Sequence, residues 1–239
     1  MSYFENTKFV PYKFGTSNEF TLHQNLGVYV DLIDQVRDNN SFYQRYTILD
    51  GDRPDVLSQK IYNSPKFYWT FFLMNDKIRE SGWPLSNQGV IKLAKKERPN
   101  TVLTTRDDLT GIFKVGSTVT GETTLATGKI IKRNLDLGQI YVEGDVNFNS
   151  TENIINENGE TNIVKLVGAV EEYNAVWRYE DVNGEQIDID PYIGPGSEVT
   201  PKTFIDRYLS ENDALKDIIV IKPDAINSVF EQFQNAMGE

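Results

Sequence analysis

Residues 46–87 read YTILDGDRPDVLSQKIYNSPKFYWTFFLMNDKIRESGWPLSN, and this stretch decides the fold that the sequence predicts. It opens with an alternating apolar run at Tyr46 and Ile48, which predicts a short strand. A sharp turn follows at Gly51, because glycine has the backbone freedom that such turns need. Pro54 then fits the first turn of a helix, where its missing N–H costs no hydrogen bond and its fixed φ suits helix entry.

A second helix is predicted directly after the first. Ser64 is the expected N-cap and Pro65 the first helical residue, so the first helix ends before them. The run Phe67–Met74 is apolar nearly all round, which is typical of a helix buried on most sides. The tripeptide Trp83-Pro84-Leu85 then forms a short extended return. The predicted unit is therefore a strand, a hairpin of two helices and a second extended piece.

This stretch also resembles the signature of a known family, the baseplate wedge proteins encoded by gene 53 in T4-like contractile-tailed phages. The matching positions are Gly51, Asp52, Pro54, Ile61-Tyr62-Asn63, Tyr68-Trp69, Asn75-Asp76 and Trp83-Pro84. The core of that family is similar to LysM, a small βααβ module otherwise known for binding peptidoglycan and chitin. The stretch RYLSENDALKDIIVIKPDAINSVFEQF resembles the end of the same family. The resemblance covers roughly residues 1–105 and 172–239.

The segment between these two regions has a different composition. From Gly111 to about Val170 it is rich in Gly, Thr, Val, Ile and Asn and alternates like a series of short strands. Candidate strands are Ile112–Val115, Thr118–Thr120, Lys129–Arg133 and Gln139–Glu143, and Asn158-Gly159 marks a hairpin. Regularly spaced turns favour a small barrel or sandwich, and the segment resembles a β-module that recurs in phage tail proteins. Its glycines match neither GxxxxGK[ST] nor GxGxxG, so no nucleotide site is predicted.

The predicted fold class is α+β. Residues 1–108 are expected to form an extended N-terminal arm and a LysM-like βααβ wedge domain, 109–170 an inserted small all-β, barrel-like domain, and 171–239 a C-terminal α+β part that completes the wedge domain. The flanking helices are an amphipathic element within 26–38, a helix over 202–212, and a last helix after Pro223. A short buried strand is expected at 217–221. On the last helix Ile226, Val229, Phe230 and Phe233 recur at helical spacing.

Composition excludes several classes of function. The 239 residues carry a net charge of −11, which disfavours both nucleic-acid binding and docking onto an anionic membrane. No window approaches the apolar length of a membrane span, and the first residues lack the pattern of a signal peptide. The chain has no cysteine, so it has no disulfide or thiolate metal site and suits a reducing cytoplasm. Its single histidine, His23, leaves little room for a catalytic triad or a zinc site, and a structural or surface role is expected for it.

Three groups of charged residues have a functional and a structural interpretation. Asp50, Asp52 and Asp55 could supply the carboxylate pair of a glycosidase, but their place at a turn and a helix start favours capping. Asp181, Glu185, Asp188 and Asp190 could suggest calcium, but the EF-hand spacing is absent and a solvated acidic loop is expected. Lys92, Lys95, Lys96 and Arg98 indicate a solvated helix end or a contact with an acidic partner. We predict no catalytic residue, no metal site and no cofactor.

Aromatic residues are the candidate partner-binding groups. The first 25 residues are expected to be an extended arm with little regular structure, whose rings must find a groove on this chain or on a neighbour. Trp69 and Phe72 are expected in the core, whereas three other rings are expected at an exposed edge. The candidate partner-binding residues are Tyr3, Phe4, Phe9 and Tyr12 in the arm and Tyr62, Tyr68 and Trp83 at that edge.

The family resemblance implies a structural, non-enzymatic virion protein. It would be a subunit of the tail baseplate, assembled in the host cytoplasm and present in multiple copies, six for a baseplate of six wedges. It would join adjacent wedges around the hub by contacting the dimeric wedge scaffold protein and neighbouring wedges, with hub or sheath-proximal proteins as further neighbours. Neither nucleic acid nor membrane is an expected partner. The alternative is a LysM-like module that binds cell-wall glycan.

Overall fold

The computed structural model describes residues 9–15, 19–24, 36–37, 39–157 and 161–238. These residues form a mixed α+β chain that divides into two compact units. Unit 1 comprises residues 1–86 and 212–239, and unit 2 comprises residues 87–211. The chain therefore leaves unit 1 once and returns to it near the C-terminus. None of the helices in the described ranges is long and apolar enough to cross a membrane.

The first described residues of unit 1 form a β-hairpin. Strand β1 (Phe9–Tyr12) pairs antiparallel with β2 (Thr21–Gln24), and Phe9 lies opposite Gln24. The expectation of an arm without regular structure is thus wrong for these residues. The predicted amphipathic element within 26–38 falls almost entirely outside the described residues.

The remainder of unit 1 follows the predicted order of a strand and two helices. Its elements are β3 (Tyr43–Thr47), α2 (Pro54–Tyr62), the 3-10 helix η1 (Pro65–Phe67), α3 (Trp69–Met74), α4 (Asp76–Ser81), β13 (Asp217–Ile221) and α7 (Ile226–Gly238). The local signals have the expected roles: Pro54 starts α2, and the Ser64 side chain accepts a hydrogen bond from the amide of Lys66 at the start of η1. Asn63 ends α2 in the left-handed conformation, and Gly51 has a positive φ of 79°.

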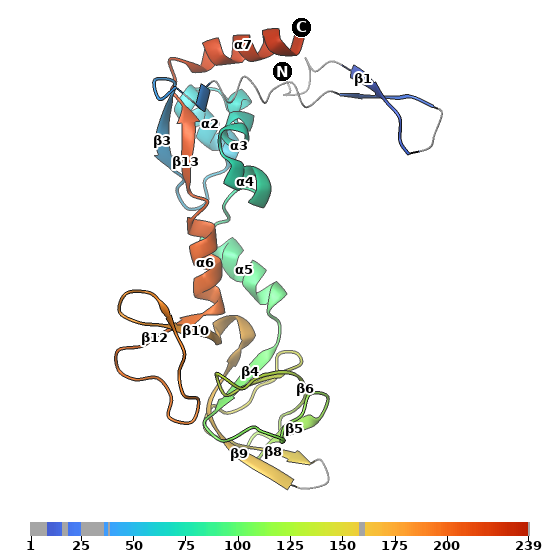
Figure 1. The fold of residues 1–239 in the computed structure, drawn as a ribbon, viewed down its shortest axis with the longest axis vertical. Coiled ribbons are helices and arrows are strands. Elements are labelled where there is room, and N and C mark those ends of the chain that lie inside the picture. Colours follow the sequence, from blue (N-terminus) through green and yellow to red (C-terminus); the bar gives the residue numbers. More distant parts are fainter. Residues whose placement is uncertain (1–8, 16–18, 25–35, 38, 158–160, 239) are drawn as a thin grey trace. The chain divides into compact units, whose positions relative to one another are not determined.

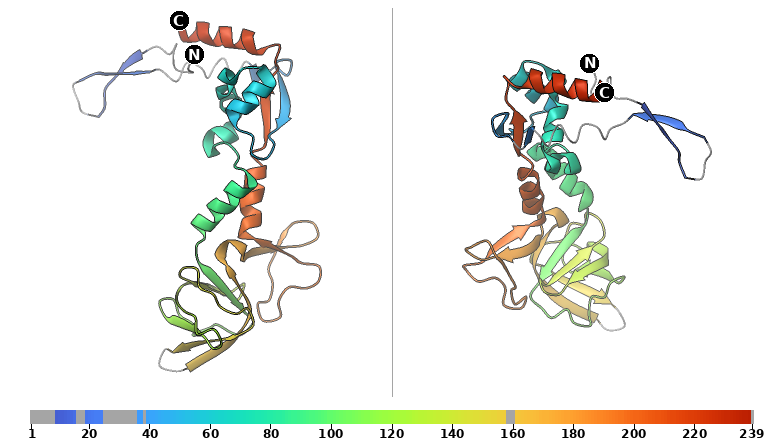
Figure 2. Two further views of the ribbon diagram at one scale, coloured as in Figure 1. Left: turned by 180° about the vertical axis from the view of Figure 1, so that it is seen from behind. Right: turned by 45° about the horizontal axis from the view of Figure 1, so that its top comes forward.

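The partner of β3 is not the one that the sequence predicts. Residues 83–85 lie in no strand, and β3 pairs antiparallel with β13, with Thr47 opposite Asp217. The reason is burial: the run Asp217–Ile221 supplies apolar side chains to both faces of the sheet, which the tripeptide Trp83-Pro84-Leu85 cannot do. Figures 1 and 2 show β3 and β13 side by side.

Two hydrophobic clusters fill unit 1, one on each face of β13. One cluster joins Ile218 and Val220 to α2, α3 and α4; its buried members are Ile48, Leu57, Phe71, Ile78, Ile218 and Val220. The other joins Ile221 to α3 and α7; its members include Trp69, Met74, Ile226, Val229 and Phe233. Trp69 is thus in the core as predicted, and Phe72 packs half-buried against the first cluster.

Unit 2 contains a closed six-stranded barrel. Its strands are β4 (Thr101–Thr105), β5 (Thr118–Gly121), β6 (Thr127–Asn134), β7 (Gln139–Val142), β8 (Asn153–Glu157) and β9 (Thr161–Glu171). Neighbours in the barrel follow the order β4-β7-β6-β5-β8-β9, and β4 closes it by pairing with β7 and β9. A cluster of aliphatic and phenylalanine side chains, including Phe113 and Ile140, fills the interior.

The barrel differs from the sequence prediction at two places. Strand β4 precedes residue 109, where we expected the β-rich domain to begin. The predicted strand Ile112–Val115 is wrong: Phe113 has a positive φ of 49° and its ring lies in the barrel core. The predicted turn at Asn158-Gly159 lies outside the described residues, and β8 and β9 on either side of it pair with each other.

Helices and a small sheet accompany the barrel in unit 2. Helix α5 (Asn87–Glu97) precedes β4, and η2 (Glu172–Asn174) follows β9. Strand β10 (Val176–Glu180) is the central strand of a three-stranded sheet with β11 (Gln186–Ile187) and β12 (Thr200–Thr203). Helix α6 (Phe204–Asp213) crosses the second boundary between the units.

Candidate functional site

The most exposed aromatic side chains of unit 1 lie on the β1–β2 hairpin. Phe9, Tyr12, Phe14, Phe20 and Leu22 are each more than half exposed. Burying rings of this size contributes strongly to binding, and few soluble surfaces leave so many of them in water. The five side chains are called the hairpin surface below.

The strand register distributes the hairpin surface over both faces. Pro11 pairs with Leu22, whereas Tyr12 pairs with Thr21 on the opposite face. The ring centroids of Tyr12 and Phe14 lie 5.0 Å apart in an edge-to-face arrangement, and those of Phe14 and His23 are also 5.0 Å apart. A two-stranded hairpin by itself is only marginally stable in water. The ring contacts therefore add to the stability of this hairpin, while the rings stay exposed.

Two of the predicted edge residues hold unit 1 together. The Tyr62 hydroxyl donates to the carbonyl of Ile221 at 3.0 Å, and its ring stacks on Phe71. Burial raises the pKa of Tyr62, so the phenol stays protonated as the donor. The Trp83 Nε1–H donates to the carbonyl of Asp52 at 2.7 Å. Both rings are half-buried, and each has a structural contact that accounts for its position.

Tyr68 is exposed, unlike Tyr62 and Trp83. Its ring is 44% exposed, although the neighbouring Trp69 is buried against Phe233. Of the seven predicted partner-binding residues, Phe9, Tyr12 and Tyr68 are therefore available at the surface. Tyr3 and Phe4 lie outside the described residues.

The carboxylates around Gly51 have structural partners. Asp52 Oδ1 lies 2.6 Å from Lys60 Nζ, and this pairing raises the pKa of the lysine. Asp55 lies in the first turn of α2 and pairs with Arg53. The expected capping is wrong in its detail, because Arg53 occupies the N-cap and makes no side-chain capping bond.

The acidic loop of unit 2 is organised by turns. The Asp181 carboxylate accepts hydrogen bonds from the amides of Glu185 and Asn183, which lower its pKa. Asp190 accepts from the amide of Tyr192. Within the described ranges no group of three histidine or acidic side chains is placed to hold a metal ion.

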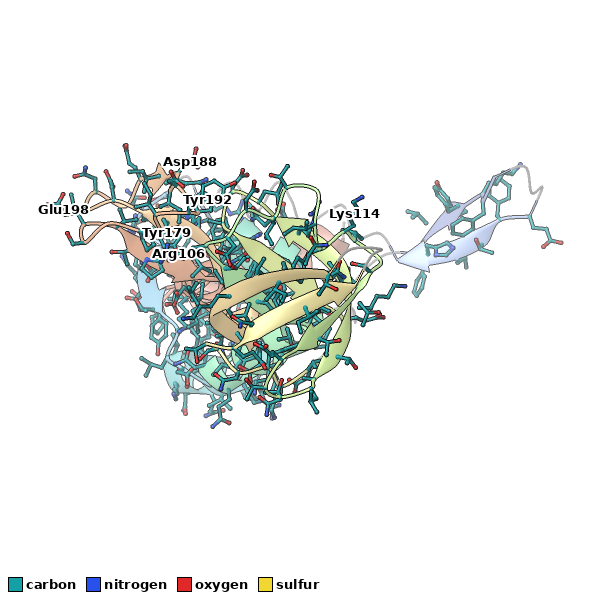
Figure 3. The ribbon with its side chains drawn as sticks, turned by 90° about the horizontal axis from the view of Figure 1, so that it is seen from below. Arg106, Lys114, Tyr179, Asp188, Tyr192 and Glu198 are labelled. Atoms are coloured by element: carbon teal, nitrogen blue, oxygen red, sulfur yellow. The ribbon has the colours of Figure 1, made fainter. Side chains whose placement is uncertain are left out.

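The same loop also contacts the start of the barrel. Figure 3 shows Arg106, Tyr179 and Tyr192 projecting on this side of unit 2. The Tyr192 hydroxyl donates to Asp108 Oδ1 at 3.2 Å, and the Arg106 guanidinium lies against the backbone of Gly194. These two contacts join the loop to the residues that follow β4.

The basic run on α5 divides into two parts. Lys92, Lys95 and Lys96 are exposed, as expected of a solvated helix end. Arg98 is different, because its Nη1 pairs at 3.0 Å with the buried Glu172 and its guanidinium lies over the Phe204 ring. The grouping of Arg98 with the solvated lysines is therefore wrong.

One open cavity of unit 2 was not foreseen from the sequence. It has a volume of about 360 Å³ and is lined by Trp177, Arg178, Glu180, Lys202, Asp206, Arg207, Ser210 and Glu211. Its charges are internally matched: Arg178 and Lys202 pair with Glu180, and Arg207 pairs with Glu211. The sequence signal that could have indicated it is the aromatic cluster around Trp177. This pairing leaves no excess charge that would select a small ligand.

No protein-family model and no curated protein matches this sequence.

Proposed function

We propose that the chain is a structural, non-enzymatic subunit of a phage tail baseplate wedge, which joins neighbouring wedges through exposed aromatic side chains. The observation that carries the proposal is the hairpin surface. Phe9, Tyr12 and Phe20 expose their rings in an ordered hairpin, and aromatic anchors of this kind dominate the binding energy of protein interfaces. The family resemblance of residues 46–87 and 207–233 supplies the class of partner.

The resembling positions have definite roles in unit 1, which supports the proposed LysM-like core. Tyr62 and Asn75 both bond to β13: the Tyr62 hydroxyl to Ile221, and the Asn75 amide to Ile219. We propose that β3, α2, η1–α3 and β13 are the βααβ unit. Its last strand then lies far along the chain, and residues 87–211 are an insertion before it.

Two features of this arrangement suit a joining subunit. The packed part of unit 1 keeps its apolar side chains in two buried clusters, so it does not depend on the hairpin surface for its own core. The hairpin surface can therefore bury its rings in a partner without unfolding unit 1. At about 25 cal/mol per Å², burial of a few such rings contributes several kcal/mol to association.

The test uses the full chain and the wedge scaffold protein encoded by the same phage, purified as its dimer. The variant carries Phe9→Ser, Tyr12→Ser, Phe14→Ser and Phe20→Ser. The matched control carries Val182→Ser and Ile193→Ser, which replace two exposed apolar side chains of unit 2. We expect the wild-type chain and the control to bind the scaffold protein in light scattering and titration, and the hairpin variant to lose binding at least tenfold, because its anchors are gone.

Purified peptidoglycan is the second arm of the same experiment. Saturable binding of the wild-type chain to peptidoglycan, without binding to the scaffold protein, would replace this proposal by glycan recognition. Equal binding of the hairpin variant and the wild-type chain to the scaffold protein would remove the hairpin surface from the interface.

A further inference from the structure

The hydrogen bonds at the ends of the β3–β13 ladder determine which way each main-chain group of β3 points. The amide of Ile48 donates to the carbonyl of Lys216 at 2.9 Å, and the amide of Lys222 donates to the carbonyl of Phe42 at 2.8 Å. In an antiparallel pair, hydrogen-bonded residues alternate with residues whose N–H and C=O point to the other side. Positions 44 and 46 therefore face β13, and positions 43, 45 and 47 face away from it.

The outer edge of β13 is closed by side chains. The Asn75 side-chain amide donates to the carbonyl of Ile219 at 2.8 Å and accepts from the amide of Ile219 at 2.7 Å. The Tyr62 hydroxyl donates to the carbonyl of Ile221. These bonds satisfy both outward groups of Ile219 and the carbonyl of Ile221, so a strand added at this edge would have to displace them.

The outer edge of β3 is open. In the part of the chain that the structure describes, no group bonds the outward main-chain N–H or C=O of Tyr43, Arg45 or Thr47. The Thr47 hydroxyl donates to Asp217 Oδ1 on β13 at 2.9 Å, so this side chain bonds toward β13. Among the described residues, the sheet therefore has one edge bonded by side chains and one edge whose donors and acceptors no group bonds, and such an edge is a template for an added strand.

Charge indicates what kind of strand fits this edge. Arg45 lies in the middle of β3, is exposed, and has no ion-pair partner among the described residues. In an antiparallel pairing of two copies centred on Arg45, the two guanidinium groups would face each other, and like charges directly opposite destabilise a sheet. A strand with a carboxylate opposite Arg45 would instead be stabilised by the attraction between the two charges.

We propose that the outer edge of β3 receives an extended segment of a different protein as an added strand, with an acidic side chain of that segment opposite Arg45. This inference rests on the proposed function for the existence of a protein partner, and it adds the place and the chemistry of a second contact besides the hairpin surface. Main-chain hydrogen bonds would supply affinity, and the acidic side chain would fix the register.

Arg45→Pro tests the edge directly. Proline at position 45 removes an outward N–H and leaves the bonds to β13 intact, and proline is tolerated on edge strands. Arg45→Gln removes the charge alone. Gln44→Ala is the matched control, since it shortens a neighbouring exposed side chain of β3 and changes neither a main-chain N–H nor a charge. Thr47→Pro removes a second outward N–H and replaces Arg45→Pro if thermal unfolding shows that the latter does not fold.

The probe is the purified wedge scaffold dimer of the same phage, titrated against each variant. We expect Arg45→Pro to weaken binding at least about tenfold, Arg45→Gln about two- to fivefold, and Gln44→Ala not at all. Residue-resolved hydrogen exchange should show the amides of Arg45 and Thr47 becoming protected in the complex, whereas those of Gln44 and Tyr46 are already protected in the free chain.

Four results would overturn the inference. The inference fails if folded Arg45→Pro binds the scaffold protein as the wild-type chain does. It also fails if the amides of Arg45 and Thr47 exchange as fast in the complex as in the free chain. In both cases the proposed function stands. A concentration-dependent dimer that Arg45→Pro abolishes would assign the edge to a second copy. Absence of any binding by the wild-type chain would overturn both the proposed function and this inference.

Discussion

The side chain of Asn75 makes two hydrogen bonds with the main chain of Ile219, a residue 144 positions later in the sequence. Its amide nitrogen also donates to the carbonyl of Phe71 at 2.8 Å, so it links the end of α3 to β13. Asn75 is among the positions on which the proposed relation to the phage wedge family rests. In this chain its role is to hold the last strand of unit 1 in place.

Replacement of Asn75 should destabilise unit 1. Asn75→Ala leaves the half-buried N–H and C=O of Ile219 without their side-chain partner, and each should cost about 1 kcal/mol, the low end for an unpaired group. Asn75→Asp keeps an acceptor for the N–H but places a carboxylate against the carbonyl, so it should be at least as costly. Urea unfolding measures the difference, with the exposed Lys77→Ala on α4 as control. Equal stability of Asn75→Ala and wild type would contradict the assigned role.

The hydrogen bond and the ring packing of Trp83 should make separable contributions to the free energy of unfolding. Trp83→Phe keeps an aromatic ring near Phe71 and Phe72 but loses the bond to the Asp52 carbonyl, and should cost about 1 kcal/mol. Trp83→Ala also removes the packing and should cost about 2–4 kcal/mol, below the range for a fully buried tryptophan.

The exposed Tyr68→Phe is the control for the Trp83 variants and should leave stability within about 0.5 kcal/mol. Chemical denaturation of the purified chains gives all three values. If Trp83→Ala unfolded at the same denaturant concentration as wild type, Trp83 would be a surface residue available to a partner, as the sequence alone suggested.

Glu152 should make the barrel sensitive to acid. Burial opposes ionisation of this carboxylate, but the amides of Thr123, Thr124 and Asn149 donate to it, and the net effect is a pKa below the ordinary value of 4.5. A lowered pKa in the folded chain means that the stabilisation is fully present above about pH 4.5 and is lost as the pH falls through the folded value.

Glu152→Gln tests this dependence. The variant should be less stable at pH 7 by about 1–3 kcal/mol, because one carboxylate oxygen that accepts from main-chain amides becomes a donor. Its stability should then fall less steeply than that of wild type below pH 4.5. Hydrogen exchange in β9 between pH 3 and pH 7 reports on the barrel. If the stability of wild type and of Glu152→Gln depended on pH in the same way, Glu152 would not be the source of the acid sensitivity.

Gly138 and Gly144 form a matched pair in the barrel. Both have positive φ, 61° and 79°, so alanine is strained at either position. A Cβ on Gly138 would overlap the carbonyl oxygen of Thr105, whereas a Cβ on Gly144 would meet no atom within 4 Å. The main chain of β4 cannot move aside as a side chain could, because Thr105 also bonds the carbonyl of Gly138 through its amide.

Gly144→Ala should therefore destabilise the chain by about 1 kcal/mol, which is the backbone strain alone. Gly138→Ala should destabilise it by about 2–4 kcal/mol, because the clash with Thr105 adds to the strain. Thermal unfolding of the two variants side by side checks the difference. The same unfolding temperature for both variants would show that the main chain of β4 shifts to make room for the added Cβ.

Local signals in the sequence predicted most of the helices and the strand β13. Pro54, Asn63 and Ser64 act within one or two turns of the chain, so their residue types suffice to locate the ends of α2 and η1. The apolar run Asp217–Ile221 was likewise recognised as a buried strand. The first barrel strand was missed because Thr101–Thr105 precedes the change in composition at Asp107, and 112–115 was mistaken for a strand because its apolar residues fill the core from a turn.

The candidate site was predicted only in part, for a related reason. Aromatic content marks Phe9, Tyr12, Tyr62 and Trp83 equally, but whether a ring is exposed depends on partners far away in sequence. Tyr62 finds its acceptor on Ile221, 159 residues later, whereas the hairpin rings remain at the surface.

The sequence by itself determined the helix ends, the apolar run of β13 and the composition of the β-rich segment. The tertiary structure alone decided that β3 pairs with β13, that side chains bond the outer edge of β13, and that no group in the described ranges bonds the outer edge of β3. Strand pairing is a contact between distant segments, selected by the burial of both faces of β13, and no local pattern encodes it.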